Sequence, residues 1–448
     1  MATEGENAAE AAPARKIHTD PTKDFFVTMI TRDILLRDCI FDLLDNSIDG
    51  ARRKPSDDPD KPFEGHLIEL TFSAEKFKIV DNCGGIRLSD AIDYAFHFGK
   101  KANSPTDVSG GIGLYGIGMK RAIFKIGRVC LVTSHAEDAS FKVSINVDEW
   151  ESRTDWDFDY EDIARSDARG TTIEISALND GVKEALGDAV FKNDLMRAIA
   201  RDYAFFVQQG LKISVGGVDV PSYKFQLRSS DSLAPAVEQY VDNGVDVRIL
   251  AGLVDELPDD IPDELKPDKV ERYGWFVICN DRVVLAANKT DETIWGDDEF
   301  NVWHPQYNGF AGYVIFQAAD QRKLPWTTTK RELDASSPLY RRTIARMKEV
   351  TRVFIQYTNA RKADLVTARV AEAPRAQVNI SELRQVQPLR LPTISAAATR
   401  PDMVNITYRR DKREVEEIKR HLGSIAMTAR DVGIKTFEYF REVELGKE

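Results

Sequence analysis

The stretch FDLLDNSIDGA, residues 41–51, combines a regular apolar pattern with polar side chains one helical turn apart. Residues 22–54 around it repeat apolar side chains at helical intervals, which predicts a helix. On one helix face Asp42 stacks against Asn46, and Asp49 follows a turn later. A carboxylate can deprotonate water, and an amide oxygen can bind magnesium. The pair would suit water attack on a metal-bound phosphate, although an ordinary solvated helix face has the same spacing.

A second motif, KIVDNCGGIRL, spans residues 78–88. A predicted strand ends at Asp81, and Gly84 and Gly85 follow it. The carboxylate could accept a hydrogen bond from an exocyclic amine, and glycines let the backbone approach a flat ring. An ordinary turn after a strand would use the same residues.

Two further motifs follow along the chain. SGGIGLYGIGMKRA, residues 109–122, feeds glycine-rich backbone into a predicted helix, and such a helix start presents free N–H groups to phosphate. Its interleaved apolar residues should pack, which distinguishes it from a flexible linker. RGTTIEI, residues 169–175, opens a predicted strand at Gly170 and Thr171 and carries little information alone.

The four motifs, in this order across roughly residues 25–180, resemble those of the GHKL ATPases. That superfamily includes gyrase B, MutL, the ninety-kilodalton heat-shock chaperones, MORC proteins and histidine kinases. FDLLDNSIDGA resembles the N-box, VDNCGGI the adenine box, GLYGIGMK the glycine box and GTT the last motif. The run YGIGMK is most similar to MORC-type proteins and their bacterial relatives.

The resemblance implies a role for each matching position. Asp42 would be the general base, Asn46 would bind Mg²⁺, Asp81 would accept from the adenine amino group, and Thr171 would join the water network beside adenine. Residues 99–112 would form a lid over ATP. The other positions expected to contact the nucleotide are Asp49, Gly85, Ile86, Gly113, Leu114, Tyr115, Gly116, Ile117, Gly118 and Lys120.

Two positions depart from the family pattern. The base is usually Glu, and Asp42 is one methylene shorter, so we expect slow turnover because a misplaced water reacts slowly. The usual first glycine of the adenine box is Cys83.

The region after residue 183 resembles the transducer domain that follows the ATPase fold in gyrase B, MutL and MORC-type proteins. WFVICNDRVVL, residues 275–285, is similar to its central hairpin, with CNDR as the turn. LPWTTTKREL, residues 324–333, is similar to the loop that returns a lysine to the γ-phosphate. Lys330 is the expected lysine, with Lys323 and Arg331 as alternatives. An ordinary surface lysine is the competing interpretation.

Composition sets the remaining expectations. The 448 residues suggest two or three domains, and no apolar run is long enough to span a membrane. A net charge of −12 does not favour a broad nucleic-acid-binding face. Four scattered cysteines favour a reducing, cytoplasmic location.

The predicted fold class is α/β: a two-layer sandwich, with a mixed sheet under helices, then a smaller α/β transducer and C-terminal helices. The predicted divisions are a disordered tail (1–21), the ATP-binding domain (22–182), the transducer (183–337), a helical segment (338–364), a linker or arm (365–405) and a C-terminal helix (406–448).

The predicted function is an ATP-gated conformational clamp that hydrolyses ATP slowly with Mg²⁺, forms an ATP-dependent homodimer and acts on a protein or nucleic-acid partner. One alternative is a non-hydrolysing ATP sensor that recruits an effector in bacterial defence or DNA processing. Another is a protein chaperone.

Overall fold

The structure is a computed structural model. It describes residues 21–99, 109–113, 116–255, 257, 271–327, 329–362, 364–372, 376–393, 406–423 and 427–446. The chain divides into two compact units, residues 1–394 and residues 395–448.

The first sheet has eight strands in the order β5-β4-β3-β6-β2-β1-β7-β8. Neighbours run antiparallel except β1 and β7, which pair in parallel, so the sheet is mixed as predicted. The strands are β1 (Leu67–Phe72), β2 (Lys76–Asp81), β3 (Gly127–His135), β4 (Ser140–Asn146), β5 (Tyr160–Asp162), β6 (Gly170–Leu178), β7 (Lys212–Val215) and β8 (Val218–Asp219).

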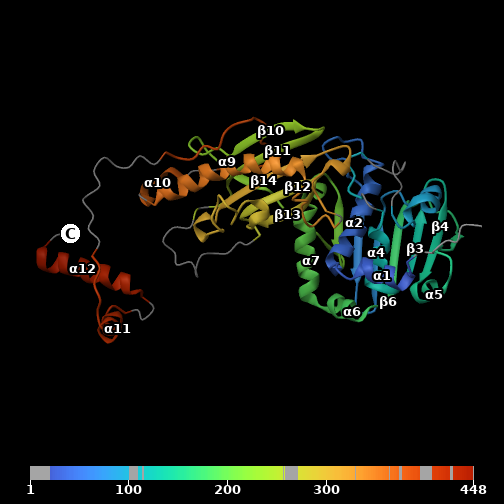
Figure 1. Cartoon of the computed structure of the whole chain (residues 1–448), viewed down its shortest axis with the longest axis horizontal. Coiled ribbons are helices and arrows are strands. Elements are labelled where there is room, and N and C mark those ends of the chain that lie inside the picture. Colours follow the sequence, from blue (N-terminus) through green and yellow to red (C-terminus); the bar gives the residue numbers. More distant parts are fainter. Residues whose placement is uncertain are drawn as a thin grey trace, which may run out of the picture. The chain divides into compact units, whose positions relative to one another are not determined.

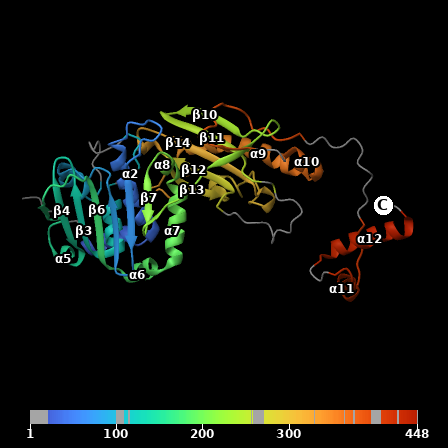
Figure 2. The same ribbon diagram turned by 180° about the vertical axis from the view of Figure 1, so that it is seen from behind.

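Helices cover one face of this sheet (Figure 1), and the strands are in view from behind (Figure 2). The central helix is α2, whose apolar residues Phe41, Leu43, Leu44 and Ile48 are buried in the core. It packs against α4. The helices of this region are α1 (Lys23–Thr31), α2 (Leu36–Arg52), α3 (Leu88–Asp90), α4 (Gly118–Ile126), α5 (Val147–Ser152), α6 (Asp180–Gly187), α7 (Ala189–Asp202) and α8 (Ala204–Gln208).

Two helix predictions need correction. Residues 22–54 form two helices, α1 and α2, because the chain leaves the helical conformation between Arg32 and Leu35. The sequence also predicts a helix in LSDAIDYAFHFG, residues 88–99, with Ser89 as its N-cap. Ser89 instead lies inside α3, which begins after Arg87 and continues as a π-helix, Ala91–Ala95.

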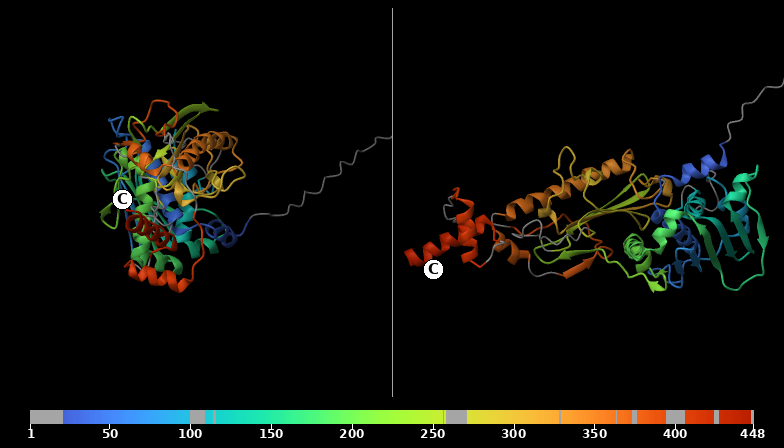
Figure 3. Two further views of the ribbon diagram at one scale, coloured as in Figure 1. Left: turned by 90° about the vertical axis from the view of Figure 1, so that its left-hand side faces the viewer. Right: turned by 90° about the horizontal axis from the view of Figure 1, so that it is seen from below.

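The second sheet has five strands in the order β10-β11-β14-β12-β13. The predicted hairpin is confirmed, since β12 and β13 flank a turn in which Asn280 and Asp281 both have positive φ, 46° and 69°. Helix α9 (Pro338–Arg361) contacts β11 and lies along this sheet (Figure 3). The strands are β10 (Ala236–Asp242), β11 (Val245–Leu253), β12 (Gly274–Cys279), β13 (Arg282–Asn288) and β14 (Phe310–Gln317). Short 3-10 helices occupy Asp291–Thr293, Pro305–Tyr307 and Gln321–Lys323.

The predicted linker, residues 365–405, is partly structured. It contains α10 (Leu365–Glu372) and β15 (Ala376–Asn379), which pairs antiparallel with β9 (Gln226–Ser229). The predicted boundary at residues 182 and 183 stays a prediction, but β7 and β8 lie beyond it and join the first sheet.

In the described residues of the second unit, 406–423 and 427–446, there are two helices where one was expected. They are α11 (Lys412–His421) and α12 (Ala429–Leu445), and they contact each other. Helix α11 ends before Gly423, which has a φ of 80°. Within the described ranges of the chain, no helix has the length and apolarity needed to cross a membrane.

Candidate functional site

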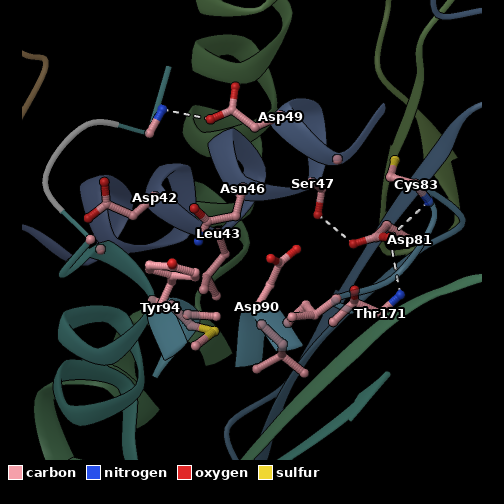
Figure 4. Close-up of a pocket in the computed structure, with 18 of the residues that line it drawn as sticks. Asp42, Leu43, Asn46, Ser47, Asp49, Asp81, Cys83, Asp90, Tyr94 and Thr171 are labelled. Carbon is pink, nitrogen blue, oxygen red and sulfur yellow. Dashed lines mark hydrogen bonds between the residues drawn. The ribbon is translucent and has the colours of Figure 1, made fainter. Parts of the chain in front are cut away.

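A pocket lies beside α2, and three of its lining residues are Asp42, Asn46 and Asp49 (Figure 4). They share one face of the helix, as their spacing predicts. The apolar residues of the same helix turn into the core, so the amphipathic pattern itself orients the three polar side chains.

The carboxylate of Asp42 is already paired with a cation. Oδ2 accepts hydrogen bonds from Nε of Arg121, at 3.1 Å, and from Nη2 of the same side chain. Lys330 Nζ lies 3.7 Å from Oδ1. Burial raises the pKa of Asp42, and the nearby charges of Lys330 and Arg121 oppose that rise. The group in the position of the general base is therefore buried between two cations.

Asp49 anchors the glycine-rich loop. Its two oxygens accept from the backbone N–H groups of Ile112, at 2.8 Å, and Gly113, at 2.7 Å. A Cβ added to Gly113 would lie 2.9 Å from Asp49 Oδ2, so the close approach favours glycine. Asp49 thus acts on the loop backbone in this structure.

Asp81 organises the opposite end of the pocket. Its carboxylate accepts from Ser47 Oγ at 2.7 Å, from the Cys83 backbone N–H at 2.9 Å and from the Thr171 backbone N–H at 3.2 Å. Strands β2 and β6 position it, because their register pairs Asp81 with Thr171. Burial raises the pKa of Asp81, and the hydrogen bond from Ser47 works against that rise.

The backbone after Asp81 is closely packed. Gly85 has a φ of 74°, and a Cβ there would lie 2.4 Å from the His135 carbonyl oxygen. The neighbouring Ile86 exchanges hydrogen bonds with the Ser134 hydroxyl. Gly85, Ile86 and Cys83 all line the pocket.

The glycine box lines the pocket at the end where Asp42 lies. A Cβ on Gly118 would lie 3.0 Å from Asp42 Cγ, so α4 starts directly against the N-box helix. The predicted residues Leu114 and Tyr115, and most of the predicted lid, lie outside the described residues. The predicted residues of this box that line the pocket are Gly113, Gly116, Ile117, Gly118 and Lys120.

Lys120 contacts backbone carbonyl groups. Its Nζ donates to Ala95 O at 2.8 Å and to Gly116 O. Burial lowers the pKa of Lys120 to about 7. The contact of Lys120 with phosphate stays a prediction. In this structure its hydrogen bonds connect α4 to Ala95, at the end of the π-helix, and to Gly116, just before α4.

Lys330 reaches the pocket from the second sheet's side of the unit. It follows β14 and lines the pocket together with Asp42 and Asn46. The two alternatives are placed elsewhere: Lys323 Nζ donates to Asn243 O at 3.0 Å, and Arg331 pairs with Asp38 and Asp202.

Several residues of the site were not predicted. Arg121, beside Asp42, follows Lys120 directly in the glycine box. The only sequence signal that could have shown that its side chain faces Asp42 is its position around the helix α4. Asp45 precedes Asn46 and turns to another side of α2, where it meets Lys330, Arg282 and Tyr203. The remaining pocket-lining residues that were not predicted include Ser47, Arg53, Asp90, Tyr94 and Met119.

The donors present fit magnesium. In the described ranges of the chain, no group of three or more His, Cys, Asp or Glu side chains could hold a metal ion by itself. Magnesium usually takes one or two protein oxygens and completes its shell with water and substrate phosphate. The Asn46 amide oxygen, which lines the same pocket as Gly113 and Gly118, is a donor of this kind, and its binding of Mg²⁺ stays a prediction.

Comparison with known families agrees with the geometry. Residues 35–179 match the family described as Histidine kinase-, DNA gyrase B-, and HSP90-like ATPase. The matched stretch is a GHKL ATPase domain, and the predicted superfamily is confirmed for it. No curated protein matches the chain. The closer similarity to MORC-type proteins stays a prediction.

Proposed function

We propose that this protein binds ATP with Mg²⁺ in the pocket beside α2, hydrolyses it slowly and uses the nucleotide to control the position of its second sheet. One observation carries the proposal. A single pocket is lined by Asp81, with its three hydrogen-bond donors, and by Lys330, which comes from beyond β14. A ligand that spans adenine and a terminal phosphate would contact both.

The residues divide the work along the ligand. Asp81 accepts from the adenine amino group, and Gly85 lines the pocket beside it. Asn46 offers an oxygen to Mg²⁺, which neutralises phosphate charge when it is bound. Lys330 supplies a cation to the terminal phosphate, and Asp42 orients the attacking water.

The output is mechanical. Lys330 belongs to the loop after the second sheet, so a phosphate that attracts it changes the contact between that sheet and α2. We infer a clamp in which ATP also brings two copies of the chain together on a protein or nucleic-acid partner.

A second candidate is an ATP sensor that does not turn over. The Asp42–Arg121 pair favours it, because Arg121 donates two hydrogen bonds to Oδ2 and so occupies an oxygen that would otherwise accept a proton from water. In this case ATP-bound protein recruits an effector and the signal ends when ATP dissociates.

Hydrolysis and binding measured side by side separate the two. Single-turnover and steady-state ATP hydrolysis with Mg²⁺ are compared for wild type, Asp42→Ala and Asn46→Ala, together with nucleotide affinity. The clamp requires that wild type turns over and that Asp42→Ala binds ATP without hydrolysing it. Binding without any Asp42-dependent rate supports the sensor. Absence of adenine-nucleotide binding by folded wild type would overturn both.

A further inference from the structure

Helix α2 has a second polar side, which faces residues of the second sheet and its loop. Asp45 is 1% exposed there. Its Oδ2 accepts from Lys330 Nζ at 2.8 Å, and its Oδ1 accepts from Tyr203 Oη at 2.9 Å and Arg282 Nε at 3.3 Å. Asp45 is thus the direct partner of the lysine that lines the pocket.

The backbone of Lys330 is also held by hydrogen bonds. The Lys330 backbone N–H donates to Thr327 O at 3.0 Å, and the Thr327 backbone N–H donates to Glu332 O at 3.0 Å. Its φ of 55° places it in the left-handed region that non-glycine residues rarely adopt. Such a backbone persists only where surrounding contacts hold it.

A buried ammonium needs an anion in the absence of ligand. Burial alone would lower the pKa of Lys330, but Asp45 and Asp42 outweigh burial and raise it. Asp45 is the closer anion, at 2.8 Å against 3.7 Å for Asp42. Lys330 and Arg282 in turn outweigh the effect of burial on Asp45 and lower its pKa.

We propose that Asp45 is a positioning residue that holds the Lys330 ammonium at the phosphate end of the pocket, and so sets the preference for a nucleoside triphosphate over a diphosphate. This inference rests on the proposed function. An ammonium that is already in place loses little conformational freedom when the terminal phosphate arrives, so the preference depends on preorganisation. Asp45 itself touches no nucleotide.

The test measures a ratio of affinities on the full chain. Isothermal titration calorimetry gives the affinities for Mg²⁺-ADP and for a non-hydrolysable Mg²⁺-ATP analogue. The ADP affinity reports the adenine end of the site, and the ratio reports the terminal phosphate. The proteins are wild type, Lys330→Met, Asp45→Asn and the double variant.

A matched control comes from the same helix side. Asp38 lies seven residues before Asp45 and pairs with Arg331 Nε at 2.8 Å, so Asp38→Asn removes a partly buried, paired charge from the same helix without removing a partner of Lys330. It should leave the ratio unchanged even where it lowers stability.

We expect Lys330→Met to lower the triphosphate preference about 10- to 100-fold, the range for a hydrogen bond to a charged group. Asp45→Asn should lower it about 10-fold with ADP affinity within twofold, and the double variant should match Lys330→Met. An unchanged ratio in Asp45→Asn overturns the inference, and so does an unchanged ratio in Lys330→Met.

Two outcomes keep the inference separate from the proposed function. If folded wild type binds neither nucleotide, the proposed function fails first. If Asp45→Asn does not fold, Asp45→Glu replaces it, since it keeps the charge but moves the carboxylate by one methylene. A reduced ratio in Asp45→Glu supports positioning, and a wild-type ratio overturns it.

Discussion

The Arg121 guanidinium lies against the Asp42 carboxylate, with Nε 3.1 Å from Oδ2 and Nη2 donating to the same oxygen. Both side chains are buried. The oxygen that remains, Oδ1, faces Lys330 at 3.7 Å. Through these contacts Asp42 connects α2 to α4 and to the loop that carries Lys330. This structural role does not depend on whether Asp42 also acts as a base.

Breaking this pair should cost stability in a non-additive way. Arg121→Met leaves the Asp42 charge with Lys330 alone, and we expect it to lower the free energy of unfolding by about 3–5 kcal/mol. Adding Asp42→Asn to Arg121→Met should restore part of the loss, because no unpaired charge remains. Urea unfolding of both single variants and the double variant gives the coupling. Strict additivity would show that the two side chains do not interact.

Removing the charge of Asp81 should weaken adenine binding. Asp81→Asn turns one acceptor oxygen into a donor facing the donors Ser47, Cys83 and Thr171, so we expect about a 10- to 100-fold loss of ADP affinity. Ser47→Ala, which removes one donor, should lose less. Asp93→Asn, an exposed carboxylate on the π-helix, serves as the control. Calorimetric titration with ADP checks the order, and equal affinities for Asp81→Asn and Asp93→Asn would contradict it.

Two adjacent glycines provide a matched pair for steric packing. Both have positive φ, 95° at Gly84 and 74° at Gly85. A Cβ on Gly84 would meet only the Lys54 side chain at 3.5 Å, whereas one on Gly85 would meet His135 O at 2.4 Å. Gly84→Ala should therefore cost about 1–2 kcal/mol of backbone strain, and Gly85→Ala clearly more. Thermal unfolding of the two variants tests this, and equal losses would show that the backbone near His135 moves aside.

The lowered pKa of Lys120 predicts how the free energy of unfolding changes with pH, including the sign of the change. Its pKa falls from 10.5 to about 7 in the folded protein, so between these values the unfolded chain binds more protons and stability rises with pH. Below about pH 7 both states are protonated and the contribution stops changing. Relative to Lys120→Met, wild type should gain up to about 1.4 kcal/mol per pH unit across this range.

The difference between wild type and Lys120→Met is measured by urea unfolding at a series of pH values. Other titrating groups largely cancel in that difference. A difference that does not change between pH 7 and pH 9.5 would rule out a neutral, buried Lys120.

The sequence predicted the parts of the site that depend on local order. The helical spacing of Asp42, Asn46 and Asp49 placed them on one face, and the strand ending at Asp81 placed a carboxylate beside glycines. The hairpin turn at Asn280 and Asp281 was equally local. These features need no knowledge of distant contacts.

Other features depend on contacts between distant residues and stayed hidden. Arg121 meets Asp42 across 79 positions, and Lys330 meets Asp45 across 285. Strand β15 is defined by its pairing with β9, which lies far away in the sequence. Without that partner in view, the residues of β15 resembled a linker. The apolar periodicity also did not show that α1 ends at Thr31 and that α2 begins at Leu36.

The parallel pairing of β1 with β7 has a practical consequence for anyone who isolates the ATPase domain. Leu67–Leu70 pair with Lys212–Val215, which lie beyond the matched stretch that ends at residue 179. A fragment cut at residue 179 would leave the β1 edge open, with unpaired backbone groups that invite aggregation. A fragment that continues through Asp219 retains β7 and β8 and keeps that edge closed.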